Sequence, residues 1–389
     1  MNTVRITLVS FLTYFLLSAM LAPIGILTGP IAEHFERPIT EVTAQFGWLT
    51  GGNLVGALIA LIIFDFFPLR WIFVVIYGAI AIALGSLSVI ETLESSRWVL
   101  GLTGMGSGIG LAGAAITISR TYEDDTRASM LVITDGCFSV AGFGFATLAT
   151  YLIGLGLFWS ATYQMVALIA AVIFFLALTS SMPETRSDRS AHAHLERWPP
   201  SVWLCVASLF LYTLGQYSVL FWLPNYAETR LGAAPDMARG LVGQFWLGMF
   251  FAQVFVAWWV LKIGVHRLVM IAAASTLLCS LPLWLVRSAD VLTWLALFWG
   301  FANLSMLKAI LSLATQMAPV ASSRLVSLLL LGATTGTAIS PFVTSQVVNW
   351  TDNRVILMFG SACYALLLVM MVTACSLTKV GPDRRAKKF

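Results

Sequence analysis

Long apolar segments alternate with short polar gaps over almost the whole chain. Each segment is close to the about 20 residues that a helix needs to cross the hydrocarbon core of a bilayer. A spanning helix satisfies its own backbone hydrogen bonds, so the pattern predicts an all-α integral membrane protein. We expect twelve transmembrane helices, at approximately 6–29, 43–64, 71–90, 97–118, 128–153, 159–181, 200–223, 238–260, 267–287, 290–311, 324–348 and 354–377.

The second half of the chain repeats the first. Displacing the sequence by 197 residues aligns Phe64–Arg70 with Leu261–Arg267, and Arg127 with Arg324. The charges recur in the polar gaps while the apolar residues around them differ. Such a repeat predicts two homologous six-helix bundles, an arrangement known for secondary transporters. The loop charges that accompany it are Asp65, Arg70, Arg127, Lys262, Arg267 and Arg324.

One long polar segment, between the sixth and seventh spans, sets the expected domain boundaries. We expect an amino-terminal bundle at 1–182, a cytoplasmic linker at 183–199, a carboxy-terminal bundle at 200–377 and a basic cytoplasmic tail at 378–389. The first span is too long for the apolar core of a secretory signal, and the repeat requires it, so we expect it to be retained.

The distribution of Lys and Arg predicts the orientation. With a cytoplasmic amino terminus, six of the 22 Lys and Arg residues fall outside, Lys308 falls inside a span, and the other 15 fall on the cytoplasmic side. An excess of Lys and Arg in short loops marks the cytoplasmic face. We therefore expect a multi-pass protein of the bacterial inner membrane with both termini in the cytoplasm. This asymmetry accounts for the net charge of +4 without a nucleic-acid partner.

The composition excludes several kinds of chemistry. Only 10% of residues are charged, against about 25% in soluble domains. The chain has no phosphate-binding GxxxxGK[ST] loop, and its five cysteines show no CxxC spacing, so we expect no metal and no cofactor. A membrane-embedded enzyme would need His, Asp or Glu clustered at a helix end, and a sensor would add a soluble domain. Neither feature is present, so an enzyme is not expected.

Several short stretches carry a family resemblance. They are Ser10–Tyr14 in the first span, Thr134–Ser139 in the fifth, Leu214–Gln216 and Trp222–Ala227 in the seventh, and Gly332–Thr337 in the eleventh. With the two six-span halves, they resemble the major facilitator superfamily, and within it TsgA-type members of the fucose:proton symporter branch. The resemblance implies the major facilitator fold and import of a sugar-like or other small polar solute.

The chain also departs from this family. The superfamily's loop between spans two and three usually reads G-x-x-x-D-R-x-G-R-R, and only Asp65 and Arg70 match it here. The membrane carboxylates that fucose-type carriers have in spans one and four are absent. The family's coupling residues therefore have no counterparts at those positions.

Two ionisable residues lie deep within predicted spans, Asp135 in the fifth and Lys308 in the tenth. A charge at the centre of a bilayer costs about 2.5–3.5 kcal/mol on insertion scales, so it is expected only where it is paired or meets water. Counting from about Ser129 in the fifth span and from about Ala314 in the tenth, both should lie roughly 9–10 Å below the cytoplasmic surface. We expect coupling or gating by these two residues, paired as a gate when the carrier faces outward. The alternatives are a lipid-facing Lys308 that reaches the interface, and a structural Asp135 bonded to neighbours such as Ser139.

Polar side chains near these charges are candidates for a solute cavity. Ser305, Lys308, Ser312 and Thr315 are spaced to share one face of a helix. In span seven, amide and aromatic groups suit a sugar-like solute, although aromatic residues in membranes also serve as packing and interfacial anchors. The cavity candidates are Gln216, Tyr212, Tyr217, Tyr14, Ser305 and Ser312.

These observations predict a secondary active transporter of a small polar solute that works by alternating access with proton coupling. Its expected partners are a small-molecule substrate, protons and the lipid bilayer, and we expect a monomer. The alternatives are an exporter of a toxic or metabolic compound with the same fold and, in another class, a membrane-embedded enzyme or sensor.

Overall fold

The computed structural model describes residues 2–122, 124–183, 198–318 and 323–377, and within them every regular element is a helix. Twelve helical segments are long and apolar enough to span a membrane, which confirms the predicted spans. The α-helices are α1 (Asn2–Leu21), α2 (Ile24–Phe35), α3 (Ile39–Phe66), α4 (Leu69–Gly85), α5 (Leu93–Thr121), α6 (Asp124–Gly154), α7 (Ala161–Leu178), α8 (Pro200–Leu231), α9 (Pro235–Ile263), α10 (Val265–Leu285), α11 (Ala289–Ala302), α12 (Met306–Met317), α13 (Ser323–Trp350) and α14 (Asn353–Leu377), with a 3₁₀ turn η1 (Ser86–Val89) after α4.

Two of the predicted spans are interrupted. The first consists of α1 and α2, which part at Pro23, where the ring removes a backbone donor. The tenth consists of α11 and α12, and it ends at Met317 rather than near 311. Leu304 and Ser305 stand between them with positive φ angles of 42° and 55°. This conformation costs a residue other than glycine about 1–3 kcal/mol, so surrounding contacts must hold it in place.

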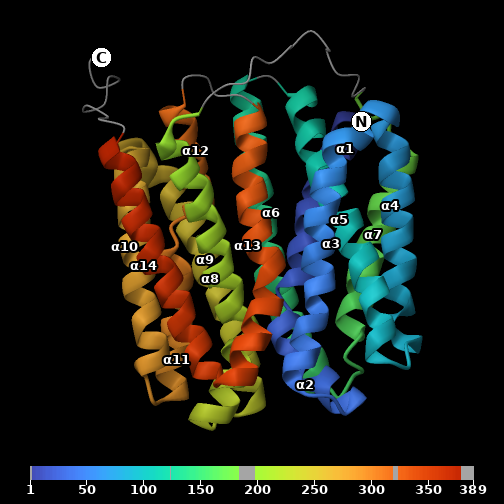
Figure 1. Ribbon diagram of the computed structural model, residues 1–389. Coiled ribbons are helices and arrows are strands. Elements are labelled where there is room, and N and C mark those ends of the chain that lie inside the picture. Colours follow the sequence, from blue (N-terminus) through green and yellow to red (C-terminus); the bar gives the residue numbers. More distant parts are fainter. Residues whose placement is uncertain (1, 123, 184–197, 319–322, 378–389) are drawn as a thin grey trace.

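The helices form two bundles that meet along their length. In the first bundle α3 packs along α5, α4 along α7, and α1 along α6; in the second, α8 packs against α13 and α14, and α9 along α11. The bundles join where α3 meets α13 and α6 meets α9. The first helix begins and the last helix ends at the same end of the molecule, here called the terminal end, whereas α2 lies at the opposite end (Figure 1). The expected all-α fold of two six-helix halves is therefore confirmed.

Glycines in α5 allow it to approach its neighbours closely. A Cβ atom on Gly104 or Gly108 would collide with a backbone carbonyl oxygen of α3, from Leu49 and Asn53 respectively. Small residues four apart commonly line such contacts in membrane proteins. The α3–α5 contact thus depends on glycine for steric reasons.

We expect Gly108→Ala to lower the stability of the folded protein by about 1–3 kcal/mol, because the added methyl group overpacks the α3–α5 contact. Gly101→Ala on the same helix is the matched control, since the nearest atom to its new Cβ would be the Trp48 carbonyl oxygen at 3.9 Å. Thermal unfolding in detergent compares the two variants. Equal unfolding temperatures would show that the contact relaxes without cost.

Candidate functional site

Asp135 and Lys308 form an ion pair that joins the two halves. Asp135 lies on α6 and Lys308 on α12, and the Lys308 Nζ atom is 3.2 Å from the Asp135 Oδ1 atom. The Lys308 side chain remains 41% exposed and that of Asp135 23% exposed. A lysine that pairs across the two halves does not lie on the lipid face. The Ser139 hydroxyl has no hydrogen-bond partner in the described part of the chain, so it does not hold Asp135.

The pair lies well away from the ends that α6 and α12 have at the terminal end of the molecule. Asp135 is about 17 Å along α6 from Asp124, and Lys308 is about 14 Å from the end of α12 at Met317, at 1.5 Å per residue. The expected depth of roughly 9–10 Å below the membrane surface stays a prediction, because both helices continue past the apolar residues from which that depth was counted.

Two tyrosines border the ion pair. Tyr14 on α1 interacts electrostatically with both charges and hydrogen-bonds to the Thr134 side chain. Tyr212 on α8 interacts electrostatically with Asp135. Side chains from α1, α6 and α12 thus meet between the halves, and Tyr212 of α8 lies within electrostatic range of them.

Toward the end opposite the terminal end, the two halves pack tightly where the first span meets α8 and where α3 meets α13. On the first span, every residue from Leu16 to Thr28 is buried, and on α8 every residue from Leu211 to Pro224 is buried. Gly25 lies directly against the backbone of α8, and Gly47 lies against the ring of Phe342. Toward the terminal end α1 becomes partly exposed, with Leu8 at 42%.

The cavity candidates of span seven lie in that enclosed region. Gln216, Tyr212 and Tyr217 are all buried. The Gln216 Oε1 atom and the Tyr212 hydroxyl have no hydrogen-bond partner among the described residues. Of the three, only Tyr212 is brought to the ion pair by an interaction that the structure shows.

The polar face predicted for span ten is shorter than expected. Ser305 is not within a continuous helix but forms the left-handed cap that precedes α12. Lys308, Ser312 and Thr315 remain on the same helix, and all three are partly buried. The break places Lys308 in the first turn of α12, which spacing alone did not indicate.

The loop charges form separate local contacts. Arg70 donates a hydrogen bond to the Leu178 carbonyl oxygen, and the Lys262 ammonium lies 3.8 Å from the centre of the Trp258 ring. Asp65 and Arg267 are exposed, and no ion pair joins Asp65 to Arg70 in the described ranges. The side chains of Arg127 and Arg324 lie outside the described part of the structure.

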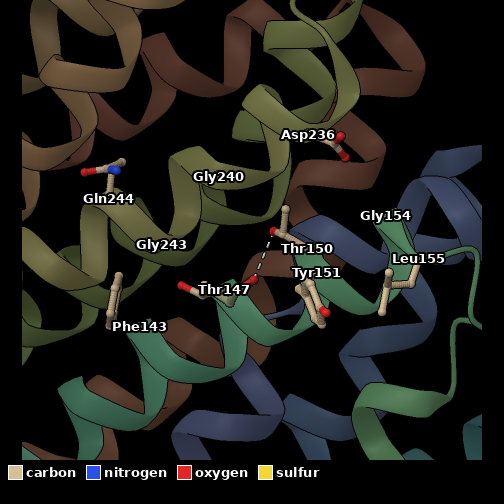
Figure 2. Close-up of a pocket in the computed structure, with 11 residues that line it drawn as sticks. Phe143, Thr147, Thr150, Tyr151, Gly154, Leu155, Asp236, Gly240, Gly243 and Gln244 are labelled. Atoms are coloured by element: carbon tan, nitrogen blue, oxygen red, sulfur yellow. Dashed lines mark hydrogen bonds between the residues drawn. The ribbon is translucent and has the colours of Figure 1, made fainter.

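A pocket of about 590 Å³ opens between α6 and α9, between the ion pair and the end opposite the terminal end. The sequence did not predict it. Figure 2 shows Thr147 and Thr150 of α6 facing Gly240 and Gly243 of α9. Its other lining residues include Tyr151, Asp236 and Gln244. The two halves form this pocket jointly, so no pattern within one helix could have predicted it.

Comparison with known proteins identifies the family. Residues 6–323 match the profile described as Major Facilitator Superfamily. The chain belongs to this superfamily. It is 28% identical over 377 residues to Protein TsgA of Salmonella arizonae, covering 95% of this chain and 94% of that protein. It is also 28% identical over 385 residues to the TsgA homolog of Edwardsiella ictaluri, covering 97% of both. The resemblance to TsgA-type members is therefore confirmed.

Solved transporters share the fold of this superfamily member. The nucleoside transporter NupG superimposes with a TM-score of 0.74 at 13% identity, over 96% of this chain and 100% of that one. A D-xylose-proton symporter superimposes with a TM-score of 0.74 at 16% identity, over 100% of both chains. The protein is a secondary transporter of small solutes in a membrane that it crosses many times, and it is not an enzyme.

Proposed function

We propose that this carrier couples the movement of a small polar solute to protons by alternating access. The observation that supports it most is the Asp135–Lys308 ion pair, which joins the halves between membrane-spanning helices and stays partly exposed. Charges placed so deep in a membrane are costly, and they commonly mark ion and substrate pathways. A carrier of this fold that is itself a proton symporter shows that the fold accommodates such coupling.

The packing of the halves supports one conformation. Gly25 contacts α8 and Gly47 contacts Phe342 toward the end opposite the terminal end, and the α6–α9 pocket leaves these contacts between the halves in place. We infer from these contacts that the halves part at the terminal end and that water reaches the ion pair from there. In the orientation proposed below, this is the state open to the cytoplasm. The ion pair is intact in that state, whereas a cytoplasmic gate would be separated in it. Of the two roles expected for the pair, the geometry therefore favours coupling.

We further propose that both termini face the cytoplasm of a bacterium, as the excess of Lys and Arg in these loops indicates. Reporter fusions after Ser190 and at the carboxy terminus should therefore report a cytoplasmic location. A fusion at Gly232, which caps α8 at the opposite end, should report the outside. A reporter after Ser190 that is active only outside would reverse this orientation.

Reconstitution tests the proposed function. The purified protein in proteoliposomes should accumulate a solute from a library of small polar compounds when a proton gradient is imposed. Collapse of the gradient by a protonophore should abolish the accumulation, and reversal of the gradient should reverse the net flux. Accumulation that is indifferent to the gradient would exclude proton coupling and leave a different driving ion.

A further inference from the structure

We propose that the solute carries a carboxylate or similar anionic group that binds Lys308 in place of Asp135, and that the displaced Asp135 takes up a proton. This inference rests on the proposed function and names the solute's chemical class. A carboxylate already lies beside Lys308, because the Asp135 Oδ1 atom is 3.2 Å from the Lys308 ammonium.

The break in span ten adds positive potential at the same point. Helix α12 begins at Met306, and its cap residue Ser305 makes no side-chain capping bond. The Met306 amide bonds to the Asn303 carbonyl oxygen at 2.8 Å, whereas the Leu307 and Lys308 amides have no acceptor among the described backbone bonds. A helix amino terminus carries about half a positive charge and favours anions. Broken spans of transporters direct such termini at anionic groups of their substrates.

An incoming anion has access to Lys308 before it displaces Asp135. An ammonium group offers three donors, and Asp135 is the only carboxylate paired with it in the described ranges. Its 41% exposure leaves the other donors open to a solute. Among the described residues, the titratable side chains that interact with Asp135 are Lys308 on α12, Tyr14 on α1 and Tyr212 on α8, and of these Lys308 alone is a cation.

Charge balance then links anion binding to proton binding. The empty site holds one negative and one positive side chain and is neutral. A bound monoanion alone would leave two negative groups for one lysine, and an uncompensated charge at this depth is unfavourable. A proton transferred from water to the Asp135 carboxylate restores neutrality. Two forms of the carrier are then neutral and can reorient between the two sides of the membrane. They are the empty carrier and the carrier loaded with one anion and one proton. No covalent bond in the solute changes.

Proton uptake by the purified protein tests this scheme. The probes are three carboxylates, each matched with the alcohol of the same skeleton: gluconate with glucitol, lactate with propane-1,2-diol, and benzoate with benzyl alcohol. Each is added at matched pH to weakly buffered protein in detergent with a pH dye. We expect at least one carboxylate to cause uptake of about one proton per protein, as the one-for-one charge balance requires. The matched alcohol should cause none.

Variants and a second measurement separate the outcomes. Uptake should be lost in Lys308→Gln and in Asp135→Asn, and it should persist in Asp290→Asn, which changes an exposed carboxylate at the start of α11. In proteoliposomes of the unaltered protein, a pH gradient should drive accumulation of the active carboxylate, and a membrane potential alone should not. Three results would overturn the inference. They are proton uptake with the alcohols, proton uptake in Lys308→Gln, and no proton uptake with any carboxylate. If an alcohol accumulates with the proton gradient, the proposed function stands and only this inference fails.

Discussion

Asp135→Asn should abolish solute accumulation driven by a proton gradient while it preserves exchange of solute between the two sides. The amide has nearly the shape of a protonated carboxyl group but binds no proton. A carrier loaded with solute then resembles the neutral loaded form and can reorient. The empty variant retains an unpaired Lys308, and this charge within a membrane-spanning helix opposes its return.

Two assays on the same proteoliposomes measure the two activities. Accumulation under an imposed pH gradient should fall to the level of protein-free vesicles, whereas exchange of labelled for unlabelled solute should stay within a few-fold of the unaltered protein. Asp290→Asn is the matched control and should behave normally in both assays. Full gradient-driven accumulation by Asp135→Asn would remove Asp135 from the coupling mechanism.

The spans and the partnership of Asp135 with Lys308 were predictable from the sequence. Spans follow from the length of apolar segments, which the bilayer thickness fixes. The ion pair was predictable because a membrane interior tolerates few charges, so two opposite charges at matching depth are expected to pair.

The break before α12 was hidden for a different reason. Leu304 is apolar and Ser305 is compatible with a membrane helix, so neither marks an interruption. Their left-handed backbone is imposed by packing around them. A proline marks the break at Pro23 in the sequence, whereas no residue marks the break before α12.

The burial of span seven was equally hidden. Gln216 and Tyr212 have the polar groups of a binding site, yet both side chains are buried in this conformation. A carrier that alternates between two packings of its halves presents a given face in only one of them. Sequence spacing describes a helix face but does not tell which state exposes it.

Removing both charges of the ion pair should be less harmful to the fold than removing one. Lys308→Gln leaves the Asp135 carboxylate without its partner. Breaking a fully buried pair costs about 3–5 kcal/mol. Because both side chains keep contact with water, we expect a smaller loss, of about 1–3 kcal/mol. The double variant Asp135→Asn with Lys308→Gln should recover most of that loss, because no uncompensated charge remains.

A double-mutant cycle on thermal unfolding in detergent measures this interaction. Arg287→Gln, which removes an exposed loop cation, is the control and should leave stability unchanged. The double variant should nevertheless fail to accumulate solute with a proton gradient, because it has neither a proton acceptor nor an anion ligand. Recovered stability with lost accumulation would separate the structural part of the pair from its part in transport. If the two single losses simply add in the double variant, the charges do not stabilise each other, and water alone accounts for their presence at this depth.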